Sequence, residues 1–223
     1  MPNATWIDSG KTDAPTKTDL ALGWIKRNRE TVIGLVVIIL AVGIFGIYFY
    51  IHYRDLRETA WKNLFIAQQT GYGGNAPQAQ TMLTDVETTY AKTTAAPYAT
   101  LTKGDLLFED GKFAEAAGQY AKLTAGPANL APFALYNLGK CKEAQGDLAG
   151  AQAQYADMLA KHPEHFMAPE AHYALGYTQD LAGAKDLAKT TYEKIVLLYP
   201  DTSWATQAKA RLTAGEQKAP VKK

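Results

Sequence analysis

Three histidines stand within the short stretch HPEHFMAPEAH, at His162, His165 and His172. Two histidines separated by three residues can bind zinc, but a structural zinc site needs four ligands in tetrahedral geometry. No fourth ligand of the right type is evident around this stretch. The sequence therefore does not predict a metal site here.

The single cysteine, Cys141, rules out an internal disulfide and leaves the redox environment of the chain open. A cysteine that acts as a nucleophile needs a basic group beside its sulfur. Lys140 and Lys142 flank Cys141 in sequence, but successive residues do not face each other on a helix. We therefore predict a buried or half-buried residue without a catalytic role.

The sequence also lacks the common motifs that indicate catalysis or phosphate binding. It contains no Gly-rich phosphate loop, no G-x-S-x-G nucleophile elbow and no pair of carboxylates in a recognisable context. Charges nearly cancel, with 23 Lys and Arg against 22 Asp and Glu. A general nucleic-acid-binding protein would need a basic surface that displaces counterions from phosphates. We therefore predict that the protein is not an enzyme, does not bind nucleic acid and uses no cofactor.

One uncharged, proline-free run of 20 residues, VIGLVVIILAVGIFGIYFYI, begins at Val32. As a helix it would be roughly 30 Å long, which matches the hydrocarbon core of a bilayer. Aromatic residues gather at its far end, as at a membrane interface, and Trp24 lies ahead of its near end. The run is too long for a signal peptide, and no A-x-A cleavage site follows it. We predict an uncleaved transmembrane helix over residues 31–53.

The flanks of this span differ little in charge, with four basic residues closely before it and three after it. The positive-inside rule then favours a cytoplasmic N-terminus and an exported C-terminal domain. Residues 1–30 are expected to form a cytoplasmic tail that is partly disordered as far as Lys17. The segment DLALGWIKRNR, at residues 19–29, fits two structures. It is either a short helix on the inner membrane surface or an extension of the transmembrane helix.

The rest of the chain repeats one order of small and aromatic residues. After a first Gly, a second Gly, an Ala, a Tyr and a Pro stand at offsets of 7, 12, 16 and 24 residues. Segments that begin at Gly139 and Gly176 contain all of these residues, and a segment that begins at Gly104 lacks only the Pro. This pattern resembles the tetratricopeptide repeat, a pair of antiparallel helices of about 34 residues. We therefore predict an all-α fold, in which a single N-terminal transmembrane helix precedes a helical solenoid.

The physical role of each repeated residue follows from this fold, as the central repeat illustrates. Gly139 and Ala151 are expected where the two helices of a pair cross, since small side chains let the backbones approach. Gly146 would end the first helix in a left-handed conformation, and Pro163 would stop the second helix. Tyr155 is expected to fill the gap between neighbouring pairs.

A fourth, degenerate repeat precedes these three, and its first helix is expected to run straight on from the span. Trp61 and Leu64 match the opening of the motif, GYGGN is the turn, and Phe65 stands where the motif has its small residue. Ser203 is expected to cap a final solvating helix. The predicted repeat domain covers residues 54–213, with repeats at 57–91, 97–130, 132–165 and 169–202, a cap helix at 203–213 and a flexible tail at 214–223.

Solenoids of this kind present a concave groove lined by the first helix of each pair. Its predicted positions lie six and three residues before each repeat glycine and one, four and five after it. They are Tyr98, Leu101, Asp105, Phe108, Glu109, Phe133, Tyr136, Lys140, Glu143, Ala144, Glu170, Tyr173, Tyr177, Asp180 and Leu181.

Six of these fifteen positions are aromatic, which is far more than a solvated face carries. Aromatic side chains anchor protein partners through large contact areas. The residues predicted to bind a partner are Tyr98, Leu101, Phe108, Phe133, Tyr136, Lys140, Tyr173 and Tyr177. In the alternative interpretation these rings pack on one another or on the first repeat. A groove that grips a carboxylate terminus would need several Lys, Arg or Asn, and only Lys140 is present.

The layout as a whole, with WIKRNRETVIGLVV leading into the span and a repeat array after it, resembles the YfgM family. Members of this family are ancillary subunits of the bacterial SecYEG translocon. The resemblance implies a single-pass inner-membrane protein with periplasmic repeats. It implies translocon subunits, a PpiD-type chaperone and exported chains as protein partners.

The last repeats, in YEKIVLLYPDTSWATQAKARL, are more similar to envelope repeat proteins of the BamD and CpoB kind. Those proteins serve outer-membrane assembly and cell-wall coordination. This similarity leaves an alternative function open, in which the chain is a scaffold or a self-assembling subunit of another envelope complex.

Overall fold

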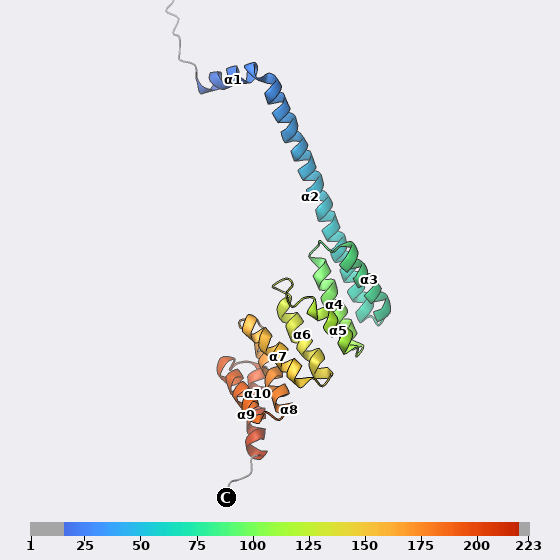
Figure 1. Ribbon diagram of the computed structural model, residues 1–223, viewed down its shortest axis with the longest axis vertical. Helices are drawn as coiled ribbons and strands as arrows, with labels where there is room; N and C mark the ends of the chain where they lie inside the picture. The colour runs from blue at the N-terminus through green and yellow to red at the C-terminus, as the bar shows by residue number, and fades with distance from the viewer. Residues whose placement is uncertain (1–15, 219–223) are drawn as a thin grey trace, which may run out of the picture. The chain divides into compact units, whose positions relative to one another are not determined.

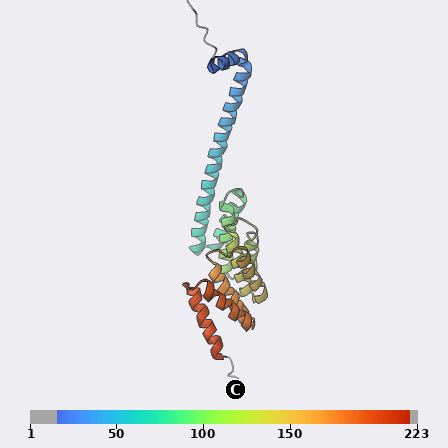
Figure 2. The same ribbon diagram turned by 90° about the vertical axis from the view of Figure 1, so that its left-hand side faces the viewer.

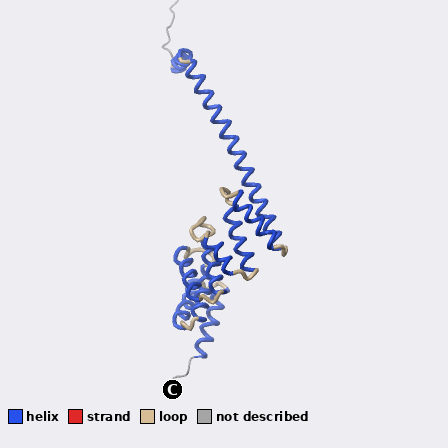
Figure 3. The backbone as a smooth tube through the Cα atoms, turned by 45° about the vertical axis from the view of Figure 1, so that its right-hand side comes forward, coloured by secondary structure: helices blue, strands red, loops and turns tan. Residues whose placement is uncertain are grey.

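The computed structural model describes residues 16–218, and within this range the chain forms ten α-helices and no β-strand (Figures 1 and 3). The chain divides into two compact units, residues 1–54 and residues 55–223. The disorder predicted for the first residues of the chain falls mostly outside the described range. The predicted all-α repeat fold is confirmed.

The first unit contains a short helix, α1 (Lys17–Arg27), and the N-terminal part of a long one, α2 (Arg29–Tyr72). The backbone breaks at Asn28, where φ is −112° and ψ is 34°, and the two helices run in different directions (Figures 1 and 2). Of the two structures considered for residues 19–29, the separate helix is therefore the observed one.

The long helix α2 carries the apolar run predicted to cross a membrane. It is the one helix in the described part of the chain that is long and apolar enough to do so. Its apolar side chains are exposed from Ile33 to the end of this run, as Ile38 at 64% and Ile44 at 69% illustrate. The same helix continues into the repeat array without a break, which confirms that the first repeat helix runs straight on from this segment.

The second unit is an array of helix pairs. Helix α2 pairs with α3 (Ala76–Thr89), α4 (Ala95–Glu109) with α5 (Phe113–Ala121), α6 (Ala131–Ala144) with α7 (Leu148–Lys161), and α8 (Ala168–Leu181) with α9 (Lys185–Leu198). Helix α10 (Ser203–Lys218) packs on α9 and α8 and continues past the predicted cap helix. Each second helix also packs on the first helix of the next pair, so the core runs on from repeat to repeat.

Glycines with positive φ close the turns inside the pairs, at Gly74, Gly111, Gly146 and Gly183 (φ 74° to 95°). No other residue of the described chain has a positive φ. A side chain with a Cβ is strained in this left-handed region, so the turn position favours glycine. The predicted role of Gly146 is confirmed.

The register of the first repeat differs from the prediction. Counting seven residues back from Gly74 places Ala67 at the small-residue position, and Ala67 is fully buried. Phe65 is 60% exposed, so the prediction that it occupies this position is wrong. Because Ala67 is small, α2 can pack closely on α3 through Ala79 and Leu83, and no loosening is needed.

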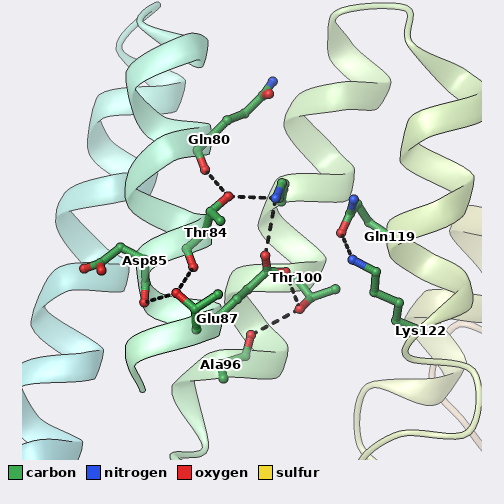
Figure 4. A network of polar contacts seen from close by, with 10 residues as sticks. Gln80, Thr84, Asp85, Glu87, Ala96, Thr100, Gln119 and Lys122 are labelled. Atoms are coloured by element: carbon green, nitrogen blue, oxygen red, sulfur yellow. Dashed lines mark hydrogen bonds and ion pairs between the residues drawn. The ribbon is translucent and has the colours of Figure 1, made fainter. Parts of the chain in front are cut away.

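A polar network joins the first repeat to the second, between α3 and α4 (Figure 4). Thr100 Oγ1 donates to Glu87 Oε1 at 2.6 Å, and Lys103 Nζ pairs with Glu87 Oε2 at 3.3 Å. Lys103 also donates to Thr84 Oγ1 at 2.8 Å. Because the side chains of Lys103 and Glu87 are 18% and 16% exposed, water screens this ion pair only partly.

Candidate partner-binding face

The repeated Gly and Tyr contact each other within each pair. A Cβ on Gly104, Gly139 or Gly176 would lie within 3.0 Å of the ring of Tyr120, Tyr155 or Tyr192, respectively. Each tyrosine ring therefore packs directly on the first helix of its own pair. Tyr155 also shares a buried cluster with Ala171 of the next pair, as expected from the sequence, so the contact with its own pair is an additional one.

Two of these buried tyrosines reach an acidic side chain of the first helix. Tyr120 Oη donates to Asp105 Oδ1 at 2.7 Å, and Tyr155 Oη donates to Glu143 Oε2 at 2.9 Å. Both acceptors belong to the fifteen positions predicted to line the groove, here termed the first-helix face. Burial raises the pKa of Asp105, and the bond from Tyr120 opposes that rise. The tyrosine of the repeat motif thus fixes a carboxylate of this face.

The pair of α8 and α9 lacks this bond. Tyr192 is 3% exposed, and its hydroxyl has no hydrogen-bond partner in the described structure. Asp180, which stands four residues after Gly176 as Glu143 does after Gly139, forms an ion pair with Lys185 at 2.5 Å. Burial raises the pKa of Tyr192, and the nearby Arg211 opposes that rise.

Aromatic side chains of the face are held at the N-terminal ends of the first helices. The rings of Tyr98 and Trp61 lie 5.1 Å apart, and Asn129 Nδ2 donates to Tyr98 Oη at 2.7 Å. The next pair has Phe133 at this position, with its ring 5.3 Å from His165 and 5.8 Å from Phe166.

Two of the three histidines considered as metal ligands, His165 and His172, pack against aromatic side chains. The ring of His165 lies 4.5 Å from that of Phe166, tilted by 37°, and its Nδ1 accepts a hydrogen bond from the backbone N–H of Met167. His172 is buried beside Tyr199. The described residues contain no group of three or more His, Cys, Asp or Glu that could hold a metal ion.

Further along the first helices, two cations lie over aromatic rings. Lys140 Nζ lies 4.8 Å from the ring centroid of Phe108, and Arg211 Cζ lies 5.1 Å from that of Tyr177. Arg211 Nε also donates to Tyr173 Oη at 3.4 Å. Such contacts hold long side chains in one place on the surface.

Tyr136 differs from the other predicted partner-binding residues because it is only 8% exposed. Its ring lies 5.5 Å from that of Tyr155, and its hydroxyl donates to Glu170 Oε1 at 2.8 Å. The other seven residues are half-buried, namely Tyr98, Leu101, Phe108, Phe133, Lys140, Tyr173 and Tyr177. All eight predicted partner-binding residues therefore lie on first helices of the array, and seven of them are partly accessible.

This surface contains two further residues that the predicted repeat positions do not include. Trp61 stands six residues before Ala67, the same offset as Tyr98 from Gly104, so the corrected register would have found it. Arg211 comes from α10, outside the repeats, and no repeat offset could have placed it over Tyr177.

The sequence of the chain matches the model of a known protein family. The family model for the tetratricopeptide repeat-like domain matches residues 23–194. The chain belongs to this family, and the fold and the match together define a repeat protein of the kind that binds other proteins. A comparison with curated protein sequences finds no match.

Solved structures show the same fold at low sequence identity. The tetratricopeptide-like repeats of a putative kinesin light chain from Podosopora anserina align with a TM-score of 0.58 and 15% identity, over 72% of this chain and 87% of that one. A tetratricopeptide repeat protein from Parabacteroides merdae aligns with a TM-score of 0.58 and 19% identity, over 74% and 60%. MamA aligns with a TM-score of 0.56 and 20% identity, over 68% and 85%.

Proposed function

We propose that this protein is a membrane-tethered interaction module that assists protein export on the periplasmic side of a bacterial inner membrane. Its first-helix face would hold a partner chaperone or an emerging exported chain. The proposed site comprises Trp61 and the partly accessible residues Tyr98, Leu101, Phe108, Phe133, Lys140, Tyr173 and Tyr177.

One observation carries the binding role, namely that half-buried aromatic rings on this face are held by neighbours and remain partly accessible. Tyr98 is fixed by Trp61 and Asn129, and Tyr177 lies under Arg211. Aromatic side chains that are already ordered lose little conformational entropy when a partner covers them. Such residues are common among those that dominate binding energy.

Charge indicates the kind of segment that would bind. The fifteen positions of the face include five carboxylates, and Lys140 is their one basic residue. Tyrosine hydroxyls donate to three of the carboxylates, Asp105, Glu143 and Glu170, and hold them in place on this face. We therefore propose an extended segment that carries basic residues next to aromatic or aliphatic ones.

The apolar part of α2 supports the tether, and the resemblance of WIKRNRETVIGLVV to the YfgM family supports the site of action. Tethering raises the effective concentration of the array near the membrane, so a weak affinity of the face would suffice. The proposed orientation, with a cytoplasmic N-terminus, is tested by protease protection of the array in spheroplasts and in inverted vesicles.

Site-specific photocrosslinking in cells tests the binding role directly. A benzophenone amino acid would replace Phe133 or Tyr177 in the full-length chain, and the control would replace Ala156, an exposed residue of α7. We expect adducts with translocon subunits, a periplasmic chaperone or exported chains from the two face positions and not from Ala156. Adducts from Ala156 alone, or equal adducts from all three positions, would rule out the face as the binding surface.

The exposed surface of α2, at the start of the array, favours a second candidate function, in which the protein is a self-assembling scaffold. Thr102 and Asn137 stand two residues before their repeat glycines and bond to the preceding first helix, through Gln68 and Asp105. Phe65 holds the same offset in the first repeat, where no preceding repeat covers it, and it is 60% exposed. Concentration-dependent association of the purified chain, lost in Phe65→Ser, would favour this function.

A further inference from the structure

Helix α1 begins and ends at defined residues. At its start, the N–H of Asp19 donates to Thr16 Oγ1 at 3.3 Å, and the N–H of Thr16 donates to Asp19 Oδ2 at 3.0 Å. At its end, the backbone N–H and the side-chain Nδ2 of Asn28 both donate to the carbonyl of Trp24, at 2.9 and 3.0 Å. This capping box and this C-cap delimit a separate helix.

No neighbour in the described part of the chain buries the apolar side chains of α1. Leu20 is 61% exposed, Leu22 54%, Trp24 53% and Ile25 42%, and no residue of the helix is buried. At 3.6 residues per turn, Leu20, Ala21, Trp24 and Ile25 share one side of α1. Leu22 lies nearer the opposite side, which carries Asp19, Gly23 and Lys26. An isolated helix of this length is only marginally stable in water, so it needs a surface to pack on.

Basic residues concentrate at the junction with the apolar run. Residues 16–30 contain four basic side chains, Lys17, Lys26, Arg27 and Arg29, against Asp19 and Glu30. Asp19 is engaged in the capping box, which lowers its pKa. Lys26 and Arg27 occupy the last turn of α1, where they also interact favourably with the helix dipole.

We propose that α1 is an in-plane helix that lies in the headgroup region of the bilayer and binds an anionic phospholipid surface. This inference rests on the proposed membrane tether, because the exposed apolar run that starts four residues after Asn28 would place α1 at the bilayer surface. Leu20, Trp24 and Ile25 would enter the boundary between headgroups and acyl chains. Lys26, Arg27 and Arg29 would contact the lipid phosphates.

An in-plane helix constrains the span that follows it. A break at Asn28 with lipid contacts on one side holds the N-terminal end of α2 at a fixed depth. It also adds a charge-based preference for the leaflet that is richer in anionic lipid. A simple extension of the transmembrane helix would give neither constraint.

Depth measurements with spin labels test this inference on the full-length chain in liposomes of phosphatidylcholine and phosphatidylglycerol. Single cysteines would replace Ala21 and Gly23 in a Cys141→Ala background. These positions are matched, because both residues are small, they lie two residues apart, and they point about 200° away from each other around the helix. A Cβ on Gly23 meets no atom within 4 Å.

The label at Ala21 is expected to collide several-fold more often with oxygen, relative to a water-soluble nickel complex, than the label at Gly23. A label at Ile39, in the centre of the apolar run, reports on the tether itself. Equal water exposure at Ala21 and Gly23 with a lipid-buried Ile39 would overturn the inference and leave the tether intact. A water-exposed Ile39 would overturn both.

The anionic preference has its own measurement. In liposomes of phosphatidylcholine alone, or in the double variant Lys26→Gln, Arg27→Gln, the difference between Ala21 and Gly23 is expected to shrink while Ile39 stays buried in lipid. An unchanged difference in both cases would overturn the role of the basic residues. Equal lipid burial at Ala21 and Gly23 would instead identify α1 as a membrane-spanning extension.

Discussion

The ring of Tyr155 packs on the backbone of Gly139, so closely that a Cβ on this glycine would lie within 3.0 Å of three ring atoms. The ring cannot easily move away, because its hydroxyl donates to Glu143 and the ring of Tyr136 lies 5.5 Å from it. The glycine is therefore a packing requirement, which connects the repeat motif to the geometry of the first-helix face.

Gly139→Ala is expected to destabilise the array by about 1–3 kcal/mol, since overpacking forces side chains or backbone to shift. Gly118→Ala on α5 is the control, because a Cβ there meets nothing within 4 Å. That variant is expected to gain up to about 1 kcal/mol from helix propensity. Urea unfolding of both full-length variants, followed by circular dichroism, measures the difference, and equal stabilities would contradict the packing argument.

Tyr155→Phe and Tyr192→Phe remove the same hydroxyl from two equivalent positions. Tyr155 donates to a carboxylate, so its loss is expected to cost about 1–2 kcal/mol. The hydroxyl of Tyr192 is buried without a partner among the described residues, so Tyr192→Phe is expected to be neutral or slightly stabilising. Thermal unfolding compares the two, and an equal loss in both variants would show that Tyr192 has a partner in solution.

Much of the fold could be predicted because the repeat offsets report local requirements. The conformation of a single helix pair requires two of the repeated glycines. One takes the positive φ of the turn, and the other, seven residues earlier, packs against the tyrosine ring. The register of the first repeat could not be predicted, because GYGGN contains three glycines. Only Gly74 has the positive φ, and the sequence alone does not show which one adopts it.

The surroundings of the face were harder to predict, because they depend on how neighbouring repeats pack together. The offsets identified the positions of Phe108 and Tyr177, but not the cations that lie over their rings. Phe133 meets His165 and Phe166, which come from an irregular loop. The burial of Tyr136 depends on contacts with both Tyr155 and Glu170, which belong to different pairs.

Cys141 is expected to be unreactive in the folded chain. It is fully buried, and burial raises the pKa of its thiol to about 11, although Lys140 acts in the opposite direction. Because the thiolate is the reactive form, labelling should require local unfolding. Mass spectrometry after treatment with a maleimide should show no adduct under native conditions and complete labelling in urea. The exposed variant Ala156→Cys is the control, and equal rates at both cysteines would contradict the prediction.

His172 is expected to make the array less stable as the pH falls below about 6.5. Burial lowers its pKa to about 4, and the nearby Lys194 acts in the same direction. Above pH 6.5 the histidine is neutral in both states, and it contributes no pH dependence. Between about pH 6.5 and 4 the unfolded chain binds a proton that the folded chain does not, so the free energy of unfolding should fall by up to about 3 kcal/mol.

The contribution of His172 is separated from that of the carboxylates by comparing two variants over the same pH range. His172→Gln should show a shallower loss of stability between pH 7 and about pH 4. His162→Gln changes a histidine of the loop before α8 and keeps His172, so it serves as the matched control beside the unmodified chain. If the His172→Gln profile runs parallel to the other two, His172 is protonated in the folded array, which would require a hydrogen-bond acceptor for Nδ1 that the structure does not show.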